Sequence, residues 1–468
     1  MTATLSDLVV VSNRLPIDVS RAADGQITYG RSPGGLVTAL QPVLSERSGA
    51  WVGWPGTPDF SFDPIRLDGI WSIPVALSAT EIAEYYEGFS NATLWPLYHD
   101  VITQPEYHRE WHEAYRAVNG KFAEKAAAAV SEGGTVWVQD YQLQLVPSMI
   151  KQLRPDVKVG FFNHIPFPPE ALFAQLPWRR EILMGLLGAD LIGFQRAQDA
   201  GNFRSCVRRV TGLTTRGHHI LVRESDGGVR DVMSSAFPIS IDSTAVDARA
   251  RQPLVQARAR EIRSELGNPD AILFGVDRLD YTKGIAHRLK AYEELLRGGR
   301  LKVPGVVMVQ VASPSRDNVS AYQALRDDVE TTVGRIAGDF GSLGSPAIHY
   351  LHQNQDPDEM AALYLAADVM LVTALRDGMN LVAKEYVASR VDGRGALVLS
   401  EFTGAADELR QALLVNPHDI DGLKNAILRA VAMSPREQRR RMQALRRRVL
   451  ENDVSSWASS FLGTLAAR

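Results

Sequence analysis

Two permanent cations follow an apolar run in the second half of the chain. The segment FGVDRLDYTKGI (274–285) passes from that run into Arg278 and then, five residues on, into Lys283 and Gly284 before a helical pattern. Arginine offers a planar fork of donors and lysine a mobile point charge, and together they suit a diphosphate removed from water. The simpler interpretation is that both cations are surface residues of an ordinary loop.

A second motif with the same order of elements is ALRDGMNLVAKEYVAS (374–389). Asp377 and Gly378 predict a tight turn, and we expect the following helix to start near Met379. The first N–H groups of a helix have no acceptor within the helix and therefore favour an anion. Here they would belong to Asn380, Leu381 and Val382.

Glu385 lies about two helical turns into that segment. A carboxylate facing a cleft accepts hydrogen bonds, so Glu385 at this position could hold both hydroxyls of a ribose. The alternative is an ordinary solvated helix residue.

Paired glycines also precede a helical pattern near the N-terminus. After the apolar run 7–13 comes Arg14, and a loop then leads to Gly34 and Gly35. Bare backbone N–H groups at such a position can approach a phosphate, although Gly-Gly is first of all a turn. The sequence has no GxxxxGK[ST] and no GxGxxG at a strand-helix junction, which disfavours P-loop NTPases and simple dehydrogenases.

No metal site is expected. His108 and His112 lie one helical turn apart in HREWH, but the Glu is misplaced for the HExxH zinc motif and no third ligand is evident. Cys206 is the only cysteine, which excludes an intramolecular disulfide and a cysteine-based zinc site, and we interpret it as a packed thiol in a reducing compartment.

The elements that position these motifs alternate between short apolar runs and longer amphipathic stretches. Buried strands are predicted at 7–13, 134–140, 157–164, 189–194, 271–278, 306–312, 367–373 and 396–401. Helical periodicity is found at 121–131, 179–188, 284–297, 357–366 and 379–390. This alternation predicts parallel sheets in an α/β architecture, with ligands bound at the carboxyl ends of the strands.

The eight predicted strands fall into two groups on either side of a different-looking middle segment. We therefore predict two domains with a linker near Pro238 to Ser243, although eight strands would also suit a single (β/α)₈ barrel with insertions. The final segment, 453–468, has a helical apolar pattern. The basic run 436–448 also carries apolar residues at helical spacing, so a solvated helix face is favoured over a nucleic-acid site.

The composition supports an ordered globular protein. Of its 468 residues, 45% are hydrophobic and 22% charged, and the formal net charge is −3, so we expect no general attraction to nucleic acid or anionic membranes. No apolar run approaches the roughly 18–20 residues of a membrane helix, and the N-terminus has no secretory pattern. We expect a cytoplasmic protein.

The motifs together resemble one enzyme family over nearly the whole chain. VSNRLP, PGGL, YYEGFSNATLWPLYH, QDYQL, FFNHIPFP, VDRLDYTKG, SPSR and DGMNLVAKE occur in the order found in the trehalose-6-phosphate synthases. These are retaining glycosyltransferases of the GT-B fold, in which two Rossmann-like domains face each other across a deep cleft. The resemblance implies transfer of glucose from a nucleoside diphosphate glucose, most simply UDP-glucose, to glucose 6-phosphate without metal or other cofactor.

The resemblance also implies a role for each motif residue. On the donor side, Arg278 and Lys283 would hold the diphosphate, Gly34 and Gly35 would approach it, Glu385 would take the ribose, and Asp377 and His164 would bind hydroxyls of the transferred glucose. The loop and first turn formed by Gly378, Met379, Asn380, Leu381 and Val382 would add backbone N–H groups. The acceptor would bind to Arg14, Trp54, Tyr86, Trp95, Asp140 and Arg316.

This division of roles predicts three parts of the chain. Residues 1–240 would form an acceptor-binding Rossmann-like domain, 241–452 a nucleotide-sugar-binding one, and 453–468 a helix crossing back to the first. Donor cations would lie in one half and acceptor residues in the other, so the active site would be the interdomain cleft. A homo-oligomer, dimer or tetramer, is also expected.

The chain departs from the family pattern in two places. It has Gln139 and Gln142 around Asp140 where the family more often has histidines, and Asn163 where a leucine is usual. Asp140 itself is retained, so the reaction class should survive. We find no convincing nucleophile for a double displacement, and we therefore expect front-side substitution through a short-lived oxocarbenium-like pair.

Two other functions are compatible with parts of this pattern. A related glucosyltransferase with another phosphorylated acceptor, such as glycerol 3-phosphate or a cyclitol phosphate, would keep the whole donor half. A catalytically idle sugar-phosphate sensor should have lost some of Arg278, Lys283, Asp377 and Glu385, and all four are present.

Overall fold

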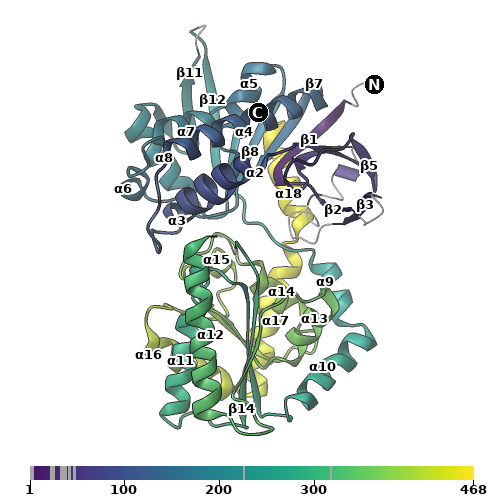
Figure 1. Ribbon diagram of the computed structural model, residues 1–468, viewed down its shortest axis with the longest axis vertical. Coiled ribbons are helices and arrows are strands. Elements are labelled where there is room, and N and C mark those ends of the chain that lie inside the picture. Colours follow the sequence, from purple (N-terminus) through teal and green to yellow (C-terminus); the bar gives the residue numbers. More distant parts are fainter. Residues whose placement is uncertain are drawn as a thin grey trace. The chain divides into compact units, whose positions relative to one another are not determined.

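The computed structural model describes residues 5–21, 27–31, 40, 44–45, 49–224, 227–316 and 319–468. Within them the chain divides into two compact units, one formed by 1–239 with 455–468 and the other by 240–454 (Figure 1). Each unit is built around its own, mainly parallel sheet, which excludes the single barrel. No helix of the described residues is long and apolar enough to cross a membrane.

The sheet of the first unit has the strand order β10-β11-β12-β9-β8-β7-β1-β4-β6-β5. Its strands are β1 (Ser6–Arg14), β4 (Ala50–Trp54), β5 (Ile65–Leu67), β6 (Ile70–Pro74), β7 (Val130–Gln139), β8 (Lys158–Asn163), β9 (Leu191–Phe194), β10 (Thr214–Arg216), β11 (His219–Arg223) and β12 (Val229–Ala236). From β12 to β6 the neighbours are parallel, whereas β5, β10 and β11 are antiparallel additions at the edges. A separate hairpin pairs β2 (Ile17–Arg21) with β3 (Ile27–Arg31).

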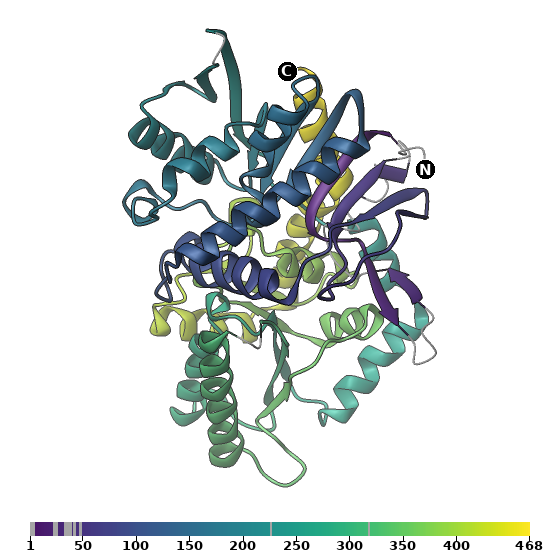
Figure 2. The same cartoon turned by 45° about the horizontal axis from the view of Figure 1, so that its top comes forward.

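Helices cover this sheet, and one of them comes from the far end of the chain. Figure 2 shows the long helix α4 (Arg109–Ala129) lying across the sheet, where it contacts β1, β4 and β7. On α18 (Val454–Ala466), the rings of Trp457 and Phe461 pack against Trp137 and Phe162, and the Trp137–Phe461 ring centroids are 4.6 Å apart. Gly160 and Gly193 make room for α18, because a Cβ at either would lie 2.8 Å from a Phe461 ring carbon.

The helical segments of the first unit begin with a wide, π-helical stretch, η1. The segments are α2 (Ala79–Glu81), η1 (Ile82–Leu94), α3 (Trp95–Tyr98), α4 (Arg109–Ala129), η2 (Tyr141–Leu143), α5 (Val146–Leu153), α6 (Glu170–Phe173), α7 (Arg179–Leu186), α8 (Ala197–Thr211) and α18 (Val454–Ala466).

The second unit has a sheet of order β15-β14-β13-β16-β17-β18, parallel throughout. Its strands are β13 (Ala271–Arg278), β14 (Val306–Ser313), β15 (Ile348–Leu351), β16 (Val369–Val372), β17 (Ala396–Ser400) and β18 (Leu413–Val415). Its helices are α9 (Ser243–Ala250), α10 (Pro253–Glu265), η3 (Tyr281–Lys283), α11 (Ile285–Arg297), α12 (Ser320–Phe340), α13 (Pro357–Ala366), α14 (Leu381–Ser389), α15 (Ala405–Glu408), α16 (Ile420–Val431) and α17 (Pro435–Glu451).

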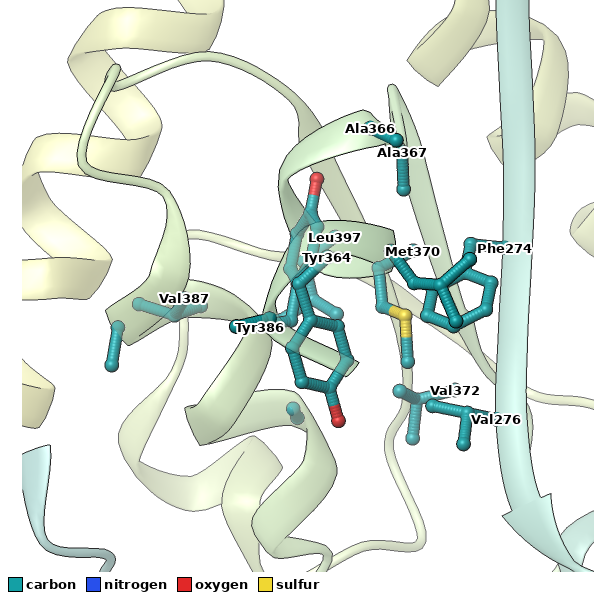
Figure 3. Packing of buried hydrophobic residues seen from close by; sticks show 14 of the residues in the cluster. Phe274, Val276, Tyr364, Ala366, Ala367, Met370, Val372, Tyr386, Val387 and Leu397 are labelled. Carbon is teal, nitrogen blue, oxygen red and sulfur yellow. The ribbon is translucent and has the colours of Figure 1, made fainter. Parts of the chain in front are cut away.

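Alternate residues of the central strands enter cores on opposite faces of this sheet. Phe274, Met370 and Val372 pack with Tyr364 and Tyr386 on one face, as Figure 3 shows. Their neighbours along the strands pack with helices α11 and α16 on the other face. A parallel sheet covered on both sides requires strands that are apolar throughout. This explains why these strands could be predicted from apolar runs in the sequence.

Candidate active site

Three cations surround one buried carboxylate at the carboxyl end of β13. Asp280 accepts hydrogen bonds from the Thr282 N–H at 2.9 Å and from Nη1 of Arg316 at 3.3 Å. Burial alone would raise the pKa of Asp280, but the positive charges of Arg316, Arg278 and Lys283 and the Thr282 N–H lower it to about 2. Asp280 is therefore a fixed negative charge that pairs with Arg316 and interacts electrostatically with Arg278 and Lys283.

The two motifs of the second unit meet at an ion pair. Nζ of Lys283 lies 2.7 Å from Oδ2 of Asp377, and both side chains are almost fully buried. The same oxygen accepts from Nδ2 of Asn380 at 3.2 Å, while Oδ1 accepts from the N–H of Met379 at 3.0 Å. The structure thus brings the predicted diphosphate cation and the predicted sugar-binding carboxylate into one site.

Gly284 allows the loop that carries Lys283 to approach the loop that carries Asp377. Its φ is +64°, which favours glycine, and a Cβ there would lie 2.1 Å from the carbonyl oxygen of Thr373. The loop before α11 can therefore press against the end of β16, where the Leu375 N–H donates to the Thr282 carbonyl at 2.7 Å.

The loop around Asp377 is held from its other side by residues 403–405. Asp377 forms a parallel bridge with Thr403, and the Ala405 N–H donates to the Met379 carbonyl at 2.8 Å. Gly404 is pressed against Gly378, since a Cβ at 404 would meet the Gly378 carbonyl oxygen at 2.0 Å. The predicted donor loop is thus fixed by backbone contacts.

The predicted start of the following helix is wrong by two residues. Helix α14 begins at Leu381, and Asn380 is its N-cap with φ +66°, accepting from the Ala383 N–H at 3.1 Å. The N–H of Met379 is already bound by Asp377, so this group is not one of the free helix-terminal donors. Leu381 and Val382 do lie in the first turn, where a helix offers no acceptor for their N–H groups.

Glu385 is a partly buried acid, and its carboxylate accepts from the Tyr364 hydroxyl at 2.9 Å. Burial raises its pKa, and the Tyr364 hydrogen bond partly opposes that rise. Tyr364 itself is anchored in the core of Figure 3. The hydrogen bond from Tyr364 therefore fixes the orientation of the Glu385 carboxylate.

In the first unit, three predicted acceptor residues form one cluster. Arg14 ends β1 and Trp54 ends β4; the guanidinium carbon of Arg14 lies 5.1 Å from the centre of the Trp54 ring. Tyr86 on η1 follows, with its ring centroid 6.0 Å from that of Trp54. Gly56, at φ +96°, gives the guanidinium room, because a Cβ there would lie 2.1 Å from it. A cation backed by aromatic rings is suited to a phosphate.

Trp95 and Asp140 lie on neighbouring elements of the same unit. The ring of Trp95 packs 5.6 Å from that of Tyr141, the residue after Asp140. Asp140 has φ +72°, an uncommon conformation for a residue other than glycine, which is typical of functional sites. Its Oδ1 accepts the N–H of His164 at 3.0 Å.

His164 is buried and neutral. Burial lowers its pKa from 6.5 to about 3. Its Nε2 lies 2.9 Å from Oε1 of Gln139, and its Nδ1 lies 3.3 Å from Nε2 of Gln195. Both ring nitrogens are thus engaged by glutamines, one of which replaces a histidine of the family pattern.

One sequence expectation changes in position, and another falls outside the described residues. Arg316 lies in the second unit beside Asp280, so the predicted acceptor residues are not confined to the half opposite the donor cations. Gly34 and Gly35 lie outside the described residues.

Among the described residues, no group of three His, Cys, Asp or Glu side chains could hold a metal ion. His112 instead stacks on Trp178 at 4.4 Å and lies 3.3 Å from a Glu181 oxygen. Cys206 is buried, and burial raises the pKa of its thiol to about 12.

Sequence reasoning overlooked Asp280, Gln195 and Tyr322, whose hydroxyl donates to Asp280 at 3.1 Å. Asp280 could have been found, since it is the acid between the two cations of VDRLDYTKG. Gln195 and Tyr322 carry no such signal, because the fold alone brings them to the site.

Comparison with known proteins matches the profile of Glycosyltransferase family 20 to residues 6–467. Trehalose-6-phosphate synthase of Mycobacterium sp. (strain JLS) is 60% identical over 465 residues, covering 98% of this chain and 96% of the relative. A solved structure described as trehalose-6-phosphate from E. coli bound with UDP-2-fluoro glucose is 34% identical, with a TM-score of 0.88 and 98% of each chain covered.

A third relative is a UDP-forming α,α-trehalose-phosphate synthase from Burkholderia xenovorans, solved in complex with glucose-6-phosphate. It is 34% identical, with a TM-score of 0.88, and the match covers 98% of this chain and 99% of that one. Two Rossmann-like units with parallel sheets define a glycosyltransferase enzyme of the GT-B class. The chain belongs to glycosyltransferase family 20. The family resemblance and the fold class expected from the sequence are confirmed.

Proposed function

We propose that this enzyme transfers glucose from UDP-glucose to glucose 6-phosphate with retention of configuration, giving α,α-trehalose 6-phosphate and UDP. The observation that carries the proposal is the pairing of Lys283 with Asp377 at 2.7 Å, which joins a diphosphate-type cation to a sugar-type carboxylate. The relatives solved with UDP-2-fluoro glucose and with glucose-6-phosphate support the choice of both substrates.

On the donor side, the second unit supplies positive charge and oriented oxygens. Lys283 has three N–H donors, so it can keep Asp377 while donating to a phosphate oxygen. In this proposal Arg278 binds the same diphosphate, the amides of Leu381 and Val382 add partial positive charge, and Glu385 accepts the ribose hydroxyls. Asp377 then binds hydroxyls of the transferred glucose.

On the acceptor side, Arg14 and Arg316 provide charge for the phosphate dianion of glucose 6-phosphate. Tyr86 and Trp95 add donors and an apolar wall, while Trp54 and Asp140 contact the sugar ring. The cluster of Arg14, Trp54 and Tyr86 supports this assignment.

We infer front-side substitution as the mechanism. The bond to the donor phosphate breaks first, the acceptor hydroxyl attacks the same face of the short-lived cation, and the leaving phosphate takes the proton. His164 is a poor nucleophile here because both ring nitrogens are engaged. The protein's own cations stabilise the growing charge on the diphosphate, and losing one such donor typically costs about 3–4 kcal/mol of barrier.

The direct test is incubation of the purified chain with UDP-glucose and glucose 6-phosphate, following the products by NMR. We expect UDP and a disaccharide phosphate with both anomeric linkages α, formed equally well after treatment with EDTA. GDP-glucose and ADP-glucose, and the acceptors glycerol 3-phosphate and inositol 1-phosphate, serve as comparisons. Turnover with one of those acceptors but not with glucose 6-phosphate would replace the proposed acceptor, and binding without turnover would favour a sensor.

A further inference from the structure

Two buried tyrosine–asparagine hydrogen bonds hold the π-helical segment η1 in place. The Tyr85 hydroxyl, on η1, donates to Oδ1 of Asn13 on β1 at 2.9 Å. The Tyr141 hydroxyl, just after β7, donates to Oδ1 of Asn91 on η1 at 2.8 Å. All four side chains are buried. Both ends of η1 are thereby tied to the carboxyl ends of two adjacent strands.

Each of these two hydrogen bonds involves a residue that directly neighbours a proposed acceptor-binding residue in the sequence. Asn13 precedes Arg14, and successive residues of a strand point to opposite faces, so Asn13 is buried while Arg14 is exposed. Tyr85 in turn precedes Tyr86, and Tyr85 is fully buried while Tyr86 is partly exposed. The buried Asn13–Tyr85 hydrogen bond therefore lies directly beneath the cluster of Arg14, Trp54 and Tyr86 in the chain, because each partner is the sequence neighbour of a cluster residue.

The Tyr141–Asn91 hydrogen bond likewise neighbours the residues proposed to contact the sugar ring. Tyr141 follows Asp140, and its ring packs 5.6 Å from that of Trp95. Its backbone carbonyl is fixed independently by the Tyr115 hydroxyl at 2.7 Å. Asp140 and Trp95 thus both depend on the placement of Tyr141.

The segment that these bonds hold has an unusual backbone. η1 covers Ile82–Leu94 in π-helical geometry, and its last bond runs from the Trp95 N–H to the Ser90 carbonyl. Long π-helical runs are rare and occur mostly at functional sites, since the wide helix packs less well along its own axis. Such a segment needs tertiary contacts to fix which side chains face the ligand.

We propose that Tyr85 and Tyr141 are positioning residues for the acceptor, whose hydroxyls hold η1 so that Tyr86 and Trp95 face the same phosphorylated sugar as Arg14 and Asp140. This proposal rests on the proposed function. Neither hydroxyl contacts the substrate in it, and both act through their neighbours in the chain.

The test compares Tyr85→Phe and Tyr141→Phe with Tyr292→Phe as a matched control. Each change removes one buried hydroxyl and keeps the ring, and Tyr292 donates to the Ala347 carbonyl at 2.8 Å inside the other unit. We expect the KM for glucose 6-phosphate to rise about five- to tenfold in the first two variants, with the KM for UDP-glucose within twofold of the parent. Tyr292→Phe should lower the melting temperature without changing either KM.

A second measurement separates positioning from general loosening. In an Arg14→Ala background, Tyr85→Phe should raise the KM for glucose 6-phosphate less than twofold, because the hydroxyl acts through the same phosphate contact. Equal effects with and without Arg14, or equal rises in both KM values, would overturn the proposal. An inactive parent enzyme would instead refute the proposed function, and binding of glucose 6-phosphate measured by calorimetry would then decide the role of Tyr85.

Discussion

The side-chain amide of Gln195 fixes the protonation of His164. Oε1 of Gln195 accepts from the Ile239 N–H at 2.9 Å, so its Nε2 must be the donor to Nδ1 of His164. With Nδ1 accepting, the ring proton lies on Nε2 and donates to Gln139. His164 is therefore held as one neutral tautomer, which suits a residue that shapes a sugar pocket better than one that shuttles protons.

This buried neutral histidine should make folding sensitive to acid. The unfolded chain takes up a proton at His164 below its ordinary pKa of 6.5, whereas the folded chain stays neutral there until about 3. Stability should therefore fall as the pH drops from 6.5, by up to roughly 1.4 kcal/mol per pH unit from this residue. Urea unfolding at pH 7 and pH 5 should show a smaller loss for His164→Asn than for the parent, and an equal loss would contradict the assignment.

Replacing Arg278 should slow the reaction without unfolding the protein. Arg278 is exposed at the end of β13, so Arg278→Ala should remove positive charge from the proposed donor site while leaving the buried part of β13 in place. We expect kcat to fall about 10²–10³-fold with an unchanged melting temperature. Arg297→Ala, which removes an exposed arginine paired with Glu293, is the control and should keep full activity. Near-normal turnover of Arg278→Ala would refute its role.

Glu385→Gln should weaken donor binding more than it slows the chemical step. The amide can still accept from Tyr364, but it loses the negative charge that a pair of ribose hydroxyls prefers. Steady-state kinetics should show a raised KM for UDP-glucose with kcat reduced only a few-fold. The opposite pattern, a large fall in kcat at constant KM, would argue against a ribose contact.

Gly284→Ala should cost both stability and donor affinity. The new Cβ would collide with the Thr373 backbone in a conformation that L-residues avoid, with a cost of about 1–3 kcal/mol or more. Gly267→Ala has a similar φ of +79° but nothing within 4 Å, so it reports the backbone strain alone. Urea unfolding and UDP calorimetry should show a larger loss for Gly284→Ala, and equal losses would mean that the close approach to β16 is unimportant.

The sequence predicted the central elements well, because a doubly covered parallel sheet needs apolar strands. All eight predicted strands are present, but β4, the hairpin strands β2 and β3, and the short or edge strands β5, β6, β10, β11, β12, β15 and β18 were missed. Most of these are only three to five residues long or alternate with polar residues on an exposed edge. The π-helical η1 was missed as well, since its residues follow no period of 3.6.

The sequence predicted individual residues of the site but not the contacts between them. Strand ends followed by cations or an acid identified Arg278, Lys283 and Asp377, whereas Asp140 was assigned only by the family resemblance. That Lys283 meets Asp377 depends on β13 lying beside β16, a pairing of strands far apart in the sequence. Arg316 was grouped with the acceptor residues of the first half by the family resemblance, although its motif, SPSR, directly follows the predicted strand 306–312 of the second half.

The first unit is completed by the last residues of the chain, since α18 supplies Trp457 and Phe461 to its core. During translation, part of the apolar sheet surface of this unit therefore remains uncovered until the whole second unit has been synthesised. The second unit has all its residues available earlier and can fold first. Removing Trp457 and Phe461 by truncation before α18 should consequently harm the part of the enzyme that was made first.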